Sequence, residues 1–104
     1  ASIIFNPSAR FKKERTSHRY VKRGECYGTE TIKYANKWQN PGSWSQKVNR
    51  CANACRNAKK NGKEADGFIV YPHGNSRGRC WCEFQDSMSC RWANNGYYRY
   101  DYGA

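Results

Sequence analysis

The spacing of apolar residues predicts one amphipathic helix in the middle of the chain. Trp44, Val48, Cys51, Cys55 and Ala58 follow one another at intervals of four, three, four and three residues, which places them on one helix face. The polar residues expected outside this apolar stripe are Lys47, Arg50, Asn57 and Lys59. A stripe of this kind is typical of a helix that packs on a protein core.

Local signals predict where the helix begins and ends. Ser43 follows Pro41-Gly42 and has Gln46 three residues later, which is the pattern of a capping box. Asn61-Gly62 is a favourable signal for a helix C-terminus, and the two lysines before it suit the negative end of the helix dipole. We therefore expect the helix to run from residue 44 to about residue 60.

Alternating apolar and polar residues predict strands after the helix and one before it. Residues 67–71 and 79–84 have strand character and are separated by a polar turn, so they are expected to form a hairpin. Residues 97–102 also alternate, and we expect them to pair with a strand that begins near Tyr20 and continues through Cys26. One face of the last strand carries Tyr98, Tyr100 and Tyr102, and the other carries Tyr97, Arg99 and Asp101.

Two cysteine pairs match these two periodicities. Cys51 and Cys55 are one helical turn apart, whereas Cys80 and Cys82 are two residues apart on a strand. A helix lying on that strand can be joined to it by two adjacent disulfides, and the sequence permits either pairing. Trp81 points away from the helix in this arrangement.

Composition favours an oxidised, secreted protein. The chain has 104 residues, of which 38% are hydrophobic, and six of them are cysteines. Disulfides would supply stability that so small a core lacks, since each bridge closing a loop of tens of residues contributes about 3 to 4 kcal/mol. Zinc ribbons space their ligands as C-x2-C pairs, which this chain does not match, so we expect no metal and no cofactor. The first residues, beginning at Ala1, are expected to be the start of a mature extracellular chain.

A net charge of +11, from 19 Lys and Arg against 8 acids, favours an anionic partner. Residues 1–20 are expected to form a basic arm and residues 21–104 the folded domain. The arm is either a solvated segment or a segment that binds polyanions. The cations expected to contact a ligand in and next to it are Arg10, Lys12, Lys13, Arg15, Arg19, Lys22 and Arg23.

Catalysis is not expected. His18 and His73 would be the acid–base pair of a small basic ribonuclease, but both are expected to be exposed surface residues. The acids are scattered, and no nucleophile motif or phosphate-binding loop is present. All six cysteines are expected to be in disulfides, which leaves no reactive thiol.

Several of these residues together carry a resemblance to the PAN/apple family. They are the helix cysteine pair, Gly67-Phe68, Gly78-Arg79-Cys80-Trp81-Cys82-Glu83 and the terminal Tyr98-Arg99-Tyr100-Asp101-Tyr102. The resemblance covers Cys26 to Tyr102 and implies an α+β fold with one central helix packed on a twisted antiparallel sheet. It also implies an outer Cys26–Cys90 disulfide and, by analogy, Cys51–Cys80, which leaves Cys55–Cys82. Many members have a cysteine before the Gly-Phe strand, where this chain has Asp66.

The resulting hypothesis is a secreted, non-enzymatic module that binds anionic extracellular ligands. Acidic or sulfated carbohydrate such as heparin is the first expectation, and an acidic protein is the second. Arg79 and Trp81 are added to the ligand-binding residues, since an outward Trp beside an Arg is suited to stacking on a sugar ring or nucleobase. The alternative for Trp81 is that a second layer of structure covers it.

Three other functions fit the same sequence. The first is a cationic host-defence or toxin protein that acts on anionic membranes or microbial envelopes, although the basic arm has no clean amphipathic stripe. The second is a structural adhesive or matrix protein, and the third is the small basic ribonuclease. Nucleic acid is expected to bind only non-specifically.

Overall fold

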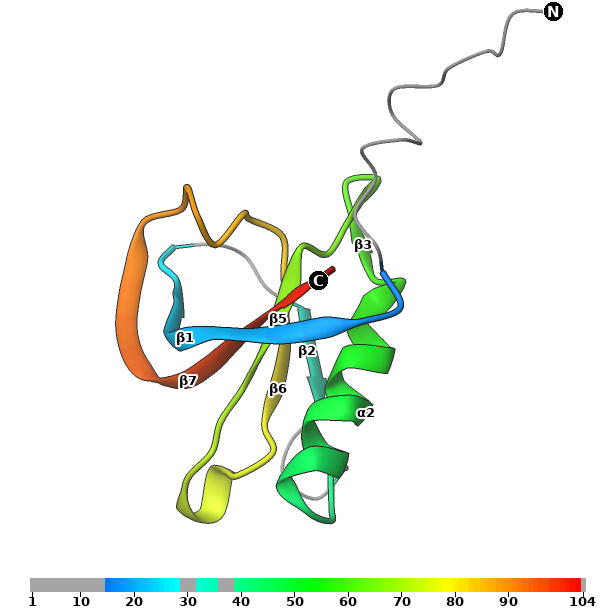
Figure 1. Cartoon of the computed structure of the whole chain (residues 1–104), viewed down its shortest axis with the longest axis vertical. Helices are drawn as coiled ribbons and strands as arrows, with labels where there is room; N and C mark the ends of the chain where they lie inside the picture. The colour runs from blue at the N-terminus through cyan, green and yellow to red at the C-terminus, as the bar shows by residue number, and fades with distance from the viewer. Residues whose placement is uncertain (1–14, 29–31, 36–38, 104) are drawn as a thin grey trace, which may run out of the picture.

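An antiparallel sheet with a helix on one face makes up the fold, as the sequence predicts (Figure 1). The computed structural model describes residues 15–28, 32–35 and 39–103, and of residues 32–35 it describes the backbone. Within these ranges, five strands pair in the order β1-β7-β5-β6-β2. The strands of this sheet are β1 (His18–Cys26), β2 (Ile32–Ala35), β5 (Gly67–Val70), β6 (Cys80–Glu83) and β7 (Trp92–Tyr102). The α+β fold class is therefore confirmed.

Helix α2 (Trp44–Arg56) begins at the predicted capping box. The backbone N–H of Gln46 donates to Ser43 Oγ at 3.2 Å, and the backbone N–H of Ser43 donates to Gln46 Oε1 at 2.8 Å. Two of the first-turn donors that a helix leaves unpaired are thereby satisfied.

The predicted end of the helix is wrong. Helix α2 ends at Arg56, so Ala58 lies beyond it. Asn61-Gly62 is instead the turn of a small hairpin between β3 (Lys59–Lys60) and β4 (Lys63–Glu64). Both turn residues have positive φ, 54° for Asn61 and 79° for Gly62, which a two-residue hairpin turn requires and Asn-Gly adopts readily.

Lys47 is buried, although the helical pattern placed it outside the apolar stripe. Its Nζ donates to the backbone oxygen of Asn40 at 2.8 Å, and the Asn40 amide donates in turn to the backbone oxygens of Lys47 and Gly78. Burial, with Arg77 and Arg50 nearby, lowers the pKa of Lys47. The loop before the helix covers this position, which helical periodicity alone does not reveal.

Three disulfides connect the elements and use all six cysteines. Cys51–Cys80 and Cys55–Cys82 join the helix to β6, and Cys26–Cys90 joins the end of β1 to the segment before β7. The first two confirm the helix-to-strand connection expected from periodicity. All three agree with the pairing that the resemblance implies.

The sheet contains the expected strand pairs, and β1 and β7 begin earlier in the chain than predicted. Strands β5 and β6 form the predicted hairpin, which turns through a short 3-10 helix, η1 (Gly74–Ser76). Strands β1 and β7 also pair as predicted, with Tyr20 opposite Tyr100 and Cys26 opposite Trp92. Because β1 begins at His18, residues 18–20 lie in the sheet rather than in a separate arm.

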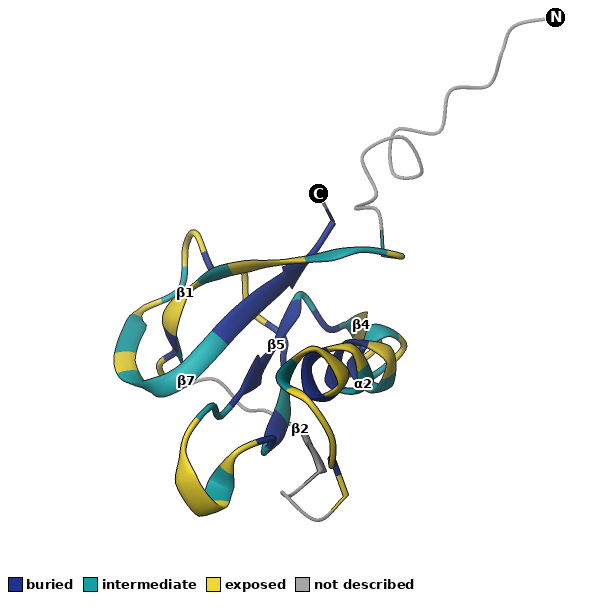
Figure 2. Cartoon of the chain, turned by 60° about the horizontal axis from the view of Figure 1, so that its bottom comes forward, coloured by how far each residue is buried: buried dark blue, intermediate teal, exposed yellow. Residues whose placement is uncertain are grey.

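The core lies between helix α2 and the sheet (Figure 2). Phe68 of β5 stacks on Tyr100 at 5.2 Å between ring centroids, and it also contacts Tyr102. Tyr102 Oη donates to the backbone oxygen of Ala52 in the helix at 2.6 Å. The face of β7 that carries Tyr98, Tyr100 and Tyr102 therefore points to the helix. No helix within the described ranges is long and apolar enough to cross a membrane.

Candidate functional site

The sheet face that points away from the helix, called here the outer face, carries a buried ionic cluster and a pocket. Because Cys80 and Cys82 point to the helix, Trp81 and Glu83 of β6 point to the outer face. Ile69 of β5 is in register with Trp81 on one side and with Arg99 of β7 on the other. These three side chains therefore lie side by side across the sheet.

One half of the outer face is filled by a buried ionic cluster around Arg99. This side chain has 0% exposure, and its Nη1 donates to Glu83 Oε1 at 2.7 Å. Its Nε donates to Asp101 Oδ1 at 2.8 Å, and its Nη2 donates to the backbone oxygen of Gln85 at 2.9 Å. The guanidinium contacts Glu83 of β6, Asp101 of β7 and the segment that follows β6. The cluster therefore fixes the course of the chain between β6 and β7.

Gly67 provides the space that this cluster needs. A Cβ atom at this position would lie 2.6 Å from Arg99 Nε and 2.3 Å from the backbone oxygen of Tyr100. The glycine of the Gly-Phe motif is therefore required because the Arg99 side chain crosses β5 at that point.

Glu83 has an altered proton affinity in this cluster. Burial raises its pKa to about 6, because the charged carboxylate loses its hydration, and the nearby Arg99 offsets part of this effect. Its Oε1 is occupied by Arg99, whereas its Oε2 has no hydrogen-bond partner within the described part of the chain. The cluster lies out of reach of solvent, so we assign it to the stability of the fold.

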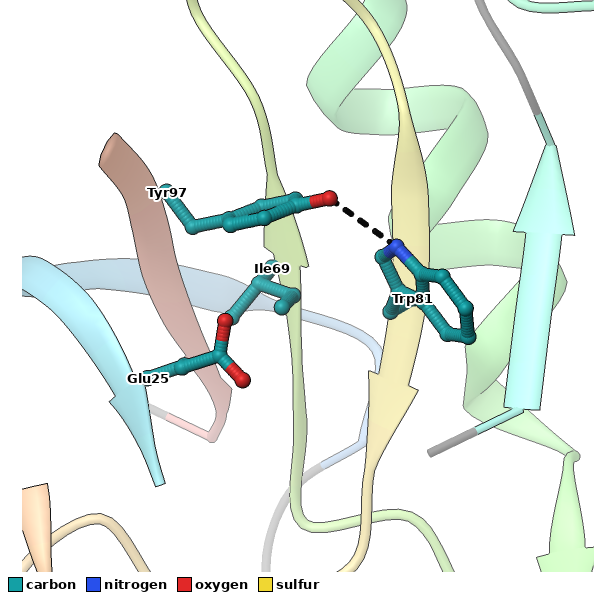
Figure 3. A pocket seen from close by; sticks show the side chains of 4 residues that line it. All are labelled: Glu25, Ile69, Trp81 and Tyr97. Carbon is teal, nitrogen blue, oxygen red and sulfur yellow. Dashed lines mark hydrogen bonds between the residues drawn. The ribbon is translucent and has the colours of Figure 1, made fainter. Parts of the chain in front are cut away.

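The other half of the outer face contains a pocket of about 190 Å³ lined by Glu25, Ile69, Trp81 and Tyr97 (Figure 3). Trp81 Nε1 donates to Tyr97 Oη at 3.0 Å, which fixes the two rings relative to each other. The Glu25 carboxylate accepts a hydrogen bond from the Asn95 amide and lies on the same side of the pocket as the Tyr97 ring. Two aromatic rings, an aliphatic floor and a carboxylate thus surround a small hollow.

Arg79 lies beside this pocket. Burial raises the pKa of the Tyr97 hydroxyl, and the positive charge and hydrogen-bonding capacity of Arg79 act against that rise. The Nε of Arg79 is buried and has no hydrogen-bond partner among the residues described. The structure therefore brings the predicted pair Arg79 and Trp81 together with Tyr97 and Glu25.

A second surface, called here the β1 edge patch, lies where β1 ends and β7 begins. It consists of Lys22, Arg23, Tyr27, Arg91 and Trp92. Lys22 Nζ lies 4.4 Å from the centroid of the Trp92 ring, and Arg91 Cζ lies 4.9 Å from that of Tyr27. Trp92 Nε1 donates to the backbone oxygen of Arg23 at 2.9 Å, and Cys26 in the same strand is held by its disulfide. The patch is therefore a set of cations positioned by aromatic rings.

The predicted cations of the arm have different environments. Arg10, Lys12 and Lys13 lie outside the described residues. Arg19 is exposed on β1, as are Lys22 and Arg23. Arg15 instead packs against the body of the protein.

Several contacts hold Arg15 in that position. Its Nε lies 3.3 Å from Glu64 Oε2, its Nη1 donates to the backbone oxygen of Ala65 at 2.8 Å, and its guanidinium lies 4.6 Å from the centroid of the Tyr102 ring. Contacts of this kind fix the start of β1 against the helix side of the molecule, so they give Arg15 a role in the fold.

The two histidines contact different rings. His18 is partly buried against Phe68 and Tyr100, and its pKa is lowered by burial and by Arg56. His73 is exposed and lies against Tyr71 and Tyr98. The expectation that both are exposed is therefore wrong for His18, because β1 carries it onto the core.

Three sulfur atoms, those of Cys51, Cys55 and Cys80, lie within 4.8 Å of one another. All three belong to disulfides, so they offer no thiolate for a metal ion.

Sequence reasoning did not identify Glu25, Tyr97, Arg91 or Trp92 as site residues. Strand alternation did place Tyr97 opposite the tyrosines that face the helix. That signal could have paired it with Trp81, which is also expected to point away from the helix. Nothing in the local sequence indicates that Glu25 reaches the same place, because β1 and β6 are brought near each other by the tertiary fold.

The chain was compared with protein-family models, curated proteins and solved structures. No protein-family model matches the chain, and no curated protein or solved structure is significantly similar to it. The structure defines a small α+β domain with three disulfides, a pocket on the outer face and a cationic edge.

Proposed function

We propose that the protein is a secreted, non-enzymatic binding module of the PAN/apple type whose ligand is an anionic carbohydrate, held at the β1 edge patch. The observation that carries the proposal is the placement of Lys22 over Trp92 and of Arg91 over Tyr27. Cations fixed by rings lose less side-chain entropy on binding than freely rotating lysines and arginines do. The sulfate or carboxylate groups of a glycan chain carry the complementary charge.

The position of the patch supports an extended ligand. Strand β1 is at the edge of the sheet and carries the exposed cations Arg19, Lys22 and Arg23 along its length. The net charge of +11 adds long-range attraction for a polyanion. Three disulfides support an extracellular location, since such bridges persist in oxidising compartments.

Elution from immobilised heparin tests the proposal. The double variant Lys22→Gln/Arg91→Gln removes two charges from the patch, and Lys59→Gln/Lys60→Gln removes two charges from the β3–β4 hairpin. We expect the patch variant to elute at clearly lower salt than the hairpin variant. For the patch variant, the slope of log affinity against log salt is also expected to be shallower by about 1 to 2. Two fewer ionic contacts form with heparin, so fewer counterions are released on binding. Equal elution of the two variants, or weak retention of the wild type at low salt, would contradict the proposal.

Cations on an edge strand also prevent two sheets from joining edge to edge. The two roles have different readouts. If the patch serves only to block association, the patch variant will form dimers or aggregates while its heparin affinity remains equal to that of the hairpin variant. Sedimentation analysis of both variants distinguishes this outcome from glycan binding.

A further inference from the structure

The pocket on the outer face differs in chemistry from the β1 edge patch. At the edge, the rings of Trp92 and Tyr27 are covered by cations of the chain itself. In the pocket, the rings of Trp81 and Tyr97 share the space with the carboxylate of Glu25 (Figure 3). Aromatic faces and a carboxylate both attract a positive charge, so the pocket is suited to a cationic group.

The hydrogen bonds inside the pocket favour an organic ammonium over a sugar. Trp81 Nε1 and Tyr97 Oη are bonded to each other, and one oxygen of Glu25 is engaged by Asn95. The indole N–H and one oxygen of the carboxylate are therefore engaged within the protein, and the pocket offers a ligand mainly ring surface and negative charge. A methylated ammonium needs no directional hydrogen bond, because its charge is spread over methyl groups that pack on rings and on Ile69.

Charge outside the pocket selects a ligand that also carries an anionic group. A simple cation is repelled by a protein with a net charge of +11, and Arg79 lies next to Tyr97. A ligand whose ammonium is joined to a phosphate has no net positive charge to be repelled, and its phosphate can pair with the Arg79 guanidinium.

We propose that Glu25, Trp81 and Tyr97 bind the ammonium end of a small zwitterion of the phosphocholine type, with its phosphate at Arg79. The hollow of about 190 Å³ suits such a headgroup rather than an oligosaccharide. This site lies apart from the β1 edge patch and does not depend on the proposed glycan binding.

Isothermal titration calorimetry with phosphocholine tests the site. We expect saturable binding that weakens at least about tenfold in Glu25→Gln and in Trp81→Leu. Choline alone and inorganic phosphate alone are each expected to bind more weakly than phosphocholine by a similar factor. The control is Asp86→Asn, which removes the same charge from an exposed side chain and keeps the Oδ1 acceptor for the backbone N–H of Met88.

Headgroups on a membrane are a second source of the same chemistry. Co-sedimentation with phosphatidylcholine vesicles, compared between wild type and Glu25→Gln, shows whether the pocket takes the headgroup from a lipid. Binding of soluble phosphocholine or of vesicles that is lost in Glu25→Gln and kept in Asp86→Asn supports the proposal.

Three results would overturn it. They are no binding of either probe up to about 10 mM, equal loss of affinity in Asp86→Asn, and binding of neutral hexoses in place of phosphocholine. Heparin elution of Glu25→Gln shows whether the fold and the edge patch remain intact, independently of ligand binding in the pocket. A failed pocket with intact heparin retention therefore leaves the proposed function standing, and the reverse result leaves the pocket standing.

Discussion

Arg99 and Glu83 form an ion pair of 2.7 Å between two side chains that are both completely buried on the sheet face opposite the helix. The pair joins β7 to β6 on either side of β5, and Asp101 provides a second carboxylate for the same guanidinium. A charge in such a place is stable only while its partners are present. The pair therefore makes the packing of the outer face sensitive to single substitutions.

Arg99→Met is expected to lower the free energy of unfolding by about 3 to 5 kcal/mol, because it leaves Glu83 and Asp101 buried without their cation. Urea unfolding at neutral pH measures this change. The matched control is Arg19→Met on the neighbouring strand, where the exposed side chain is expected to change stability by less than about 0.5 kcal/mol. Equal stability of the two variants would show that the cluster is not important for the fold.

Glu83 is expected to make stability depend on pH. Its pKa is raised from 4.5 to about 6 in the folded protein, so the folded state keeps this proton while the unfolded chain has released it. The stabilisation is complete below the unfolded pKa and is lost as pH rises through the folded pKa, a total of about 2 kcal/mol.

The change must be measured against Glu83→Gln, because His18 acts in the opposite direction. The pKa of His18 is lowered, so its contribution to stability is lost as pH falls below its unfolded value. The variant keeps His18 but cannot ionise at position 83. The stability of the wild type minus that of Glu83→Gln is therefore expected to fall between about pH 4 and about pH 7. A constant difference across that range would contradict the raised pKa.

The three disulfides are expected to contribute unequally. Cys51–Cys80 spans 29 residues and Cys55–Cys82 spans 27, so either bridge alone already closes almost the same loop. Replacing Cys51 and Cys80 by Ala then frees only a small additional loop and is expected to cost about 2 kcal/mol. Replacing Cys26 and Cys90 opens a much larger loop and is expected to cost about 4 kcal/mol. Thermal unfolding of the two double variants would show the opposite order if loop entropy were not the dominant effect.

Gly67→Ala is expected to destabilise the protein by about 1 to 3 kcal/mol through overpacking. The added methyl group would meet Arg99 Nε and the backbone oxygen of Tyr100, and the backbone at Gly67 is not in the left-handed region, so the effect is steric. Denaturant unfolding is compared with that of Asn94→Ala, an exposed position on β7. A change as small as that of the control would show that Arg99 can move aside without cost.

The fold was more accessible from the sequence than the candidate site. The capping box at Ser43 and the helix-to-strand disulfides follow from short-range spacing, and both are confirmed. The expected pairing of β1 with β7 is confirmed as well. The helix end was wrong because Asn-Gly signals a helix terminus and a hairpin turn equally well. Burial of Lys47 was missed because the loop just before the helix covers it. Burial of Arg99 was missed because its partners, Glu83 and the backbone of Gln85, are remote in sequence.

Composition determined the net charge, and the periodicities of the sequence determined the start of the helix, the strands and the faces that carry the cysteines. These properties depend on residues within one or two turns of each other, where backbone geometry fixes which side chains share a face. Only the tertiary structure decided that Glu25, Trp81 and Tyr97 surround one pocket and that Arg99 is buried between Glu83 and Asp101. Those contacts join strands that are far apart in the chain. The sheet order places β5 between β7 and β6, and the end of β1 reaches β6, where the backbone N–H of Cys26 donates to Glu83 Oε1.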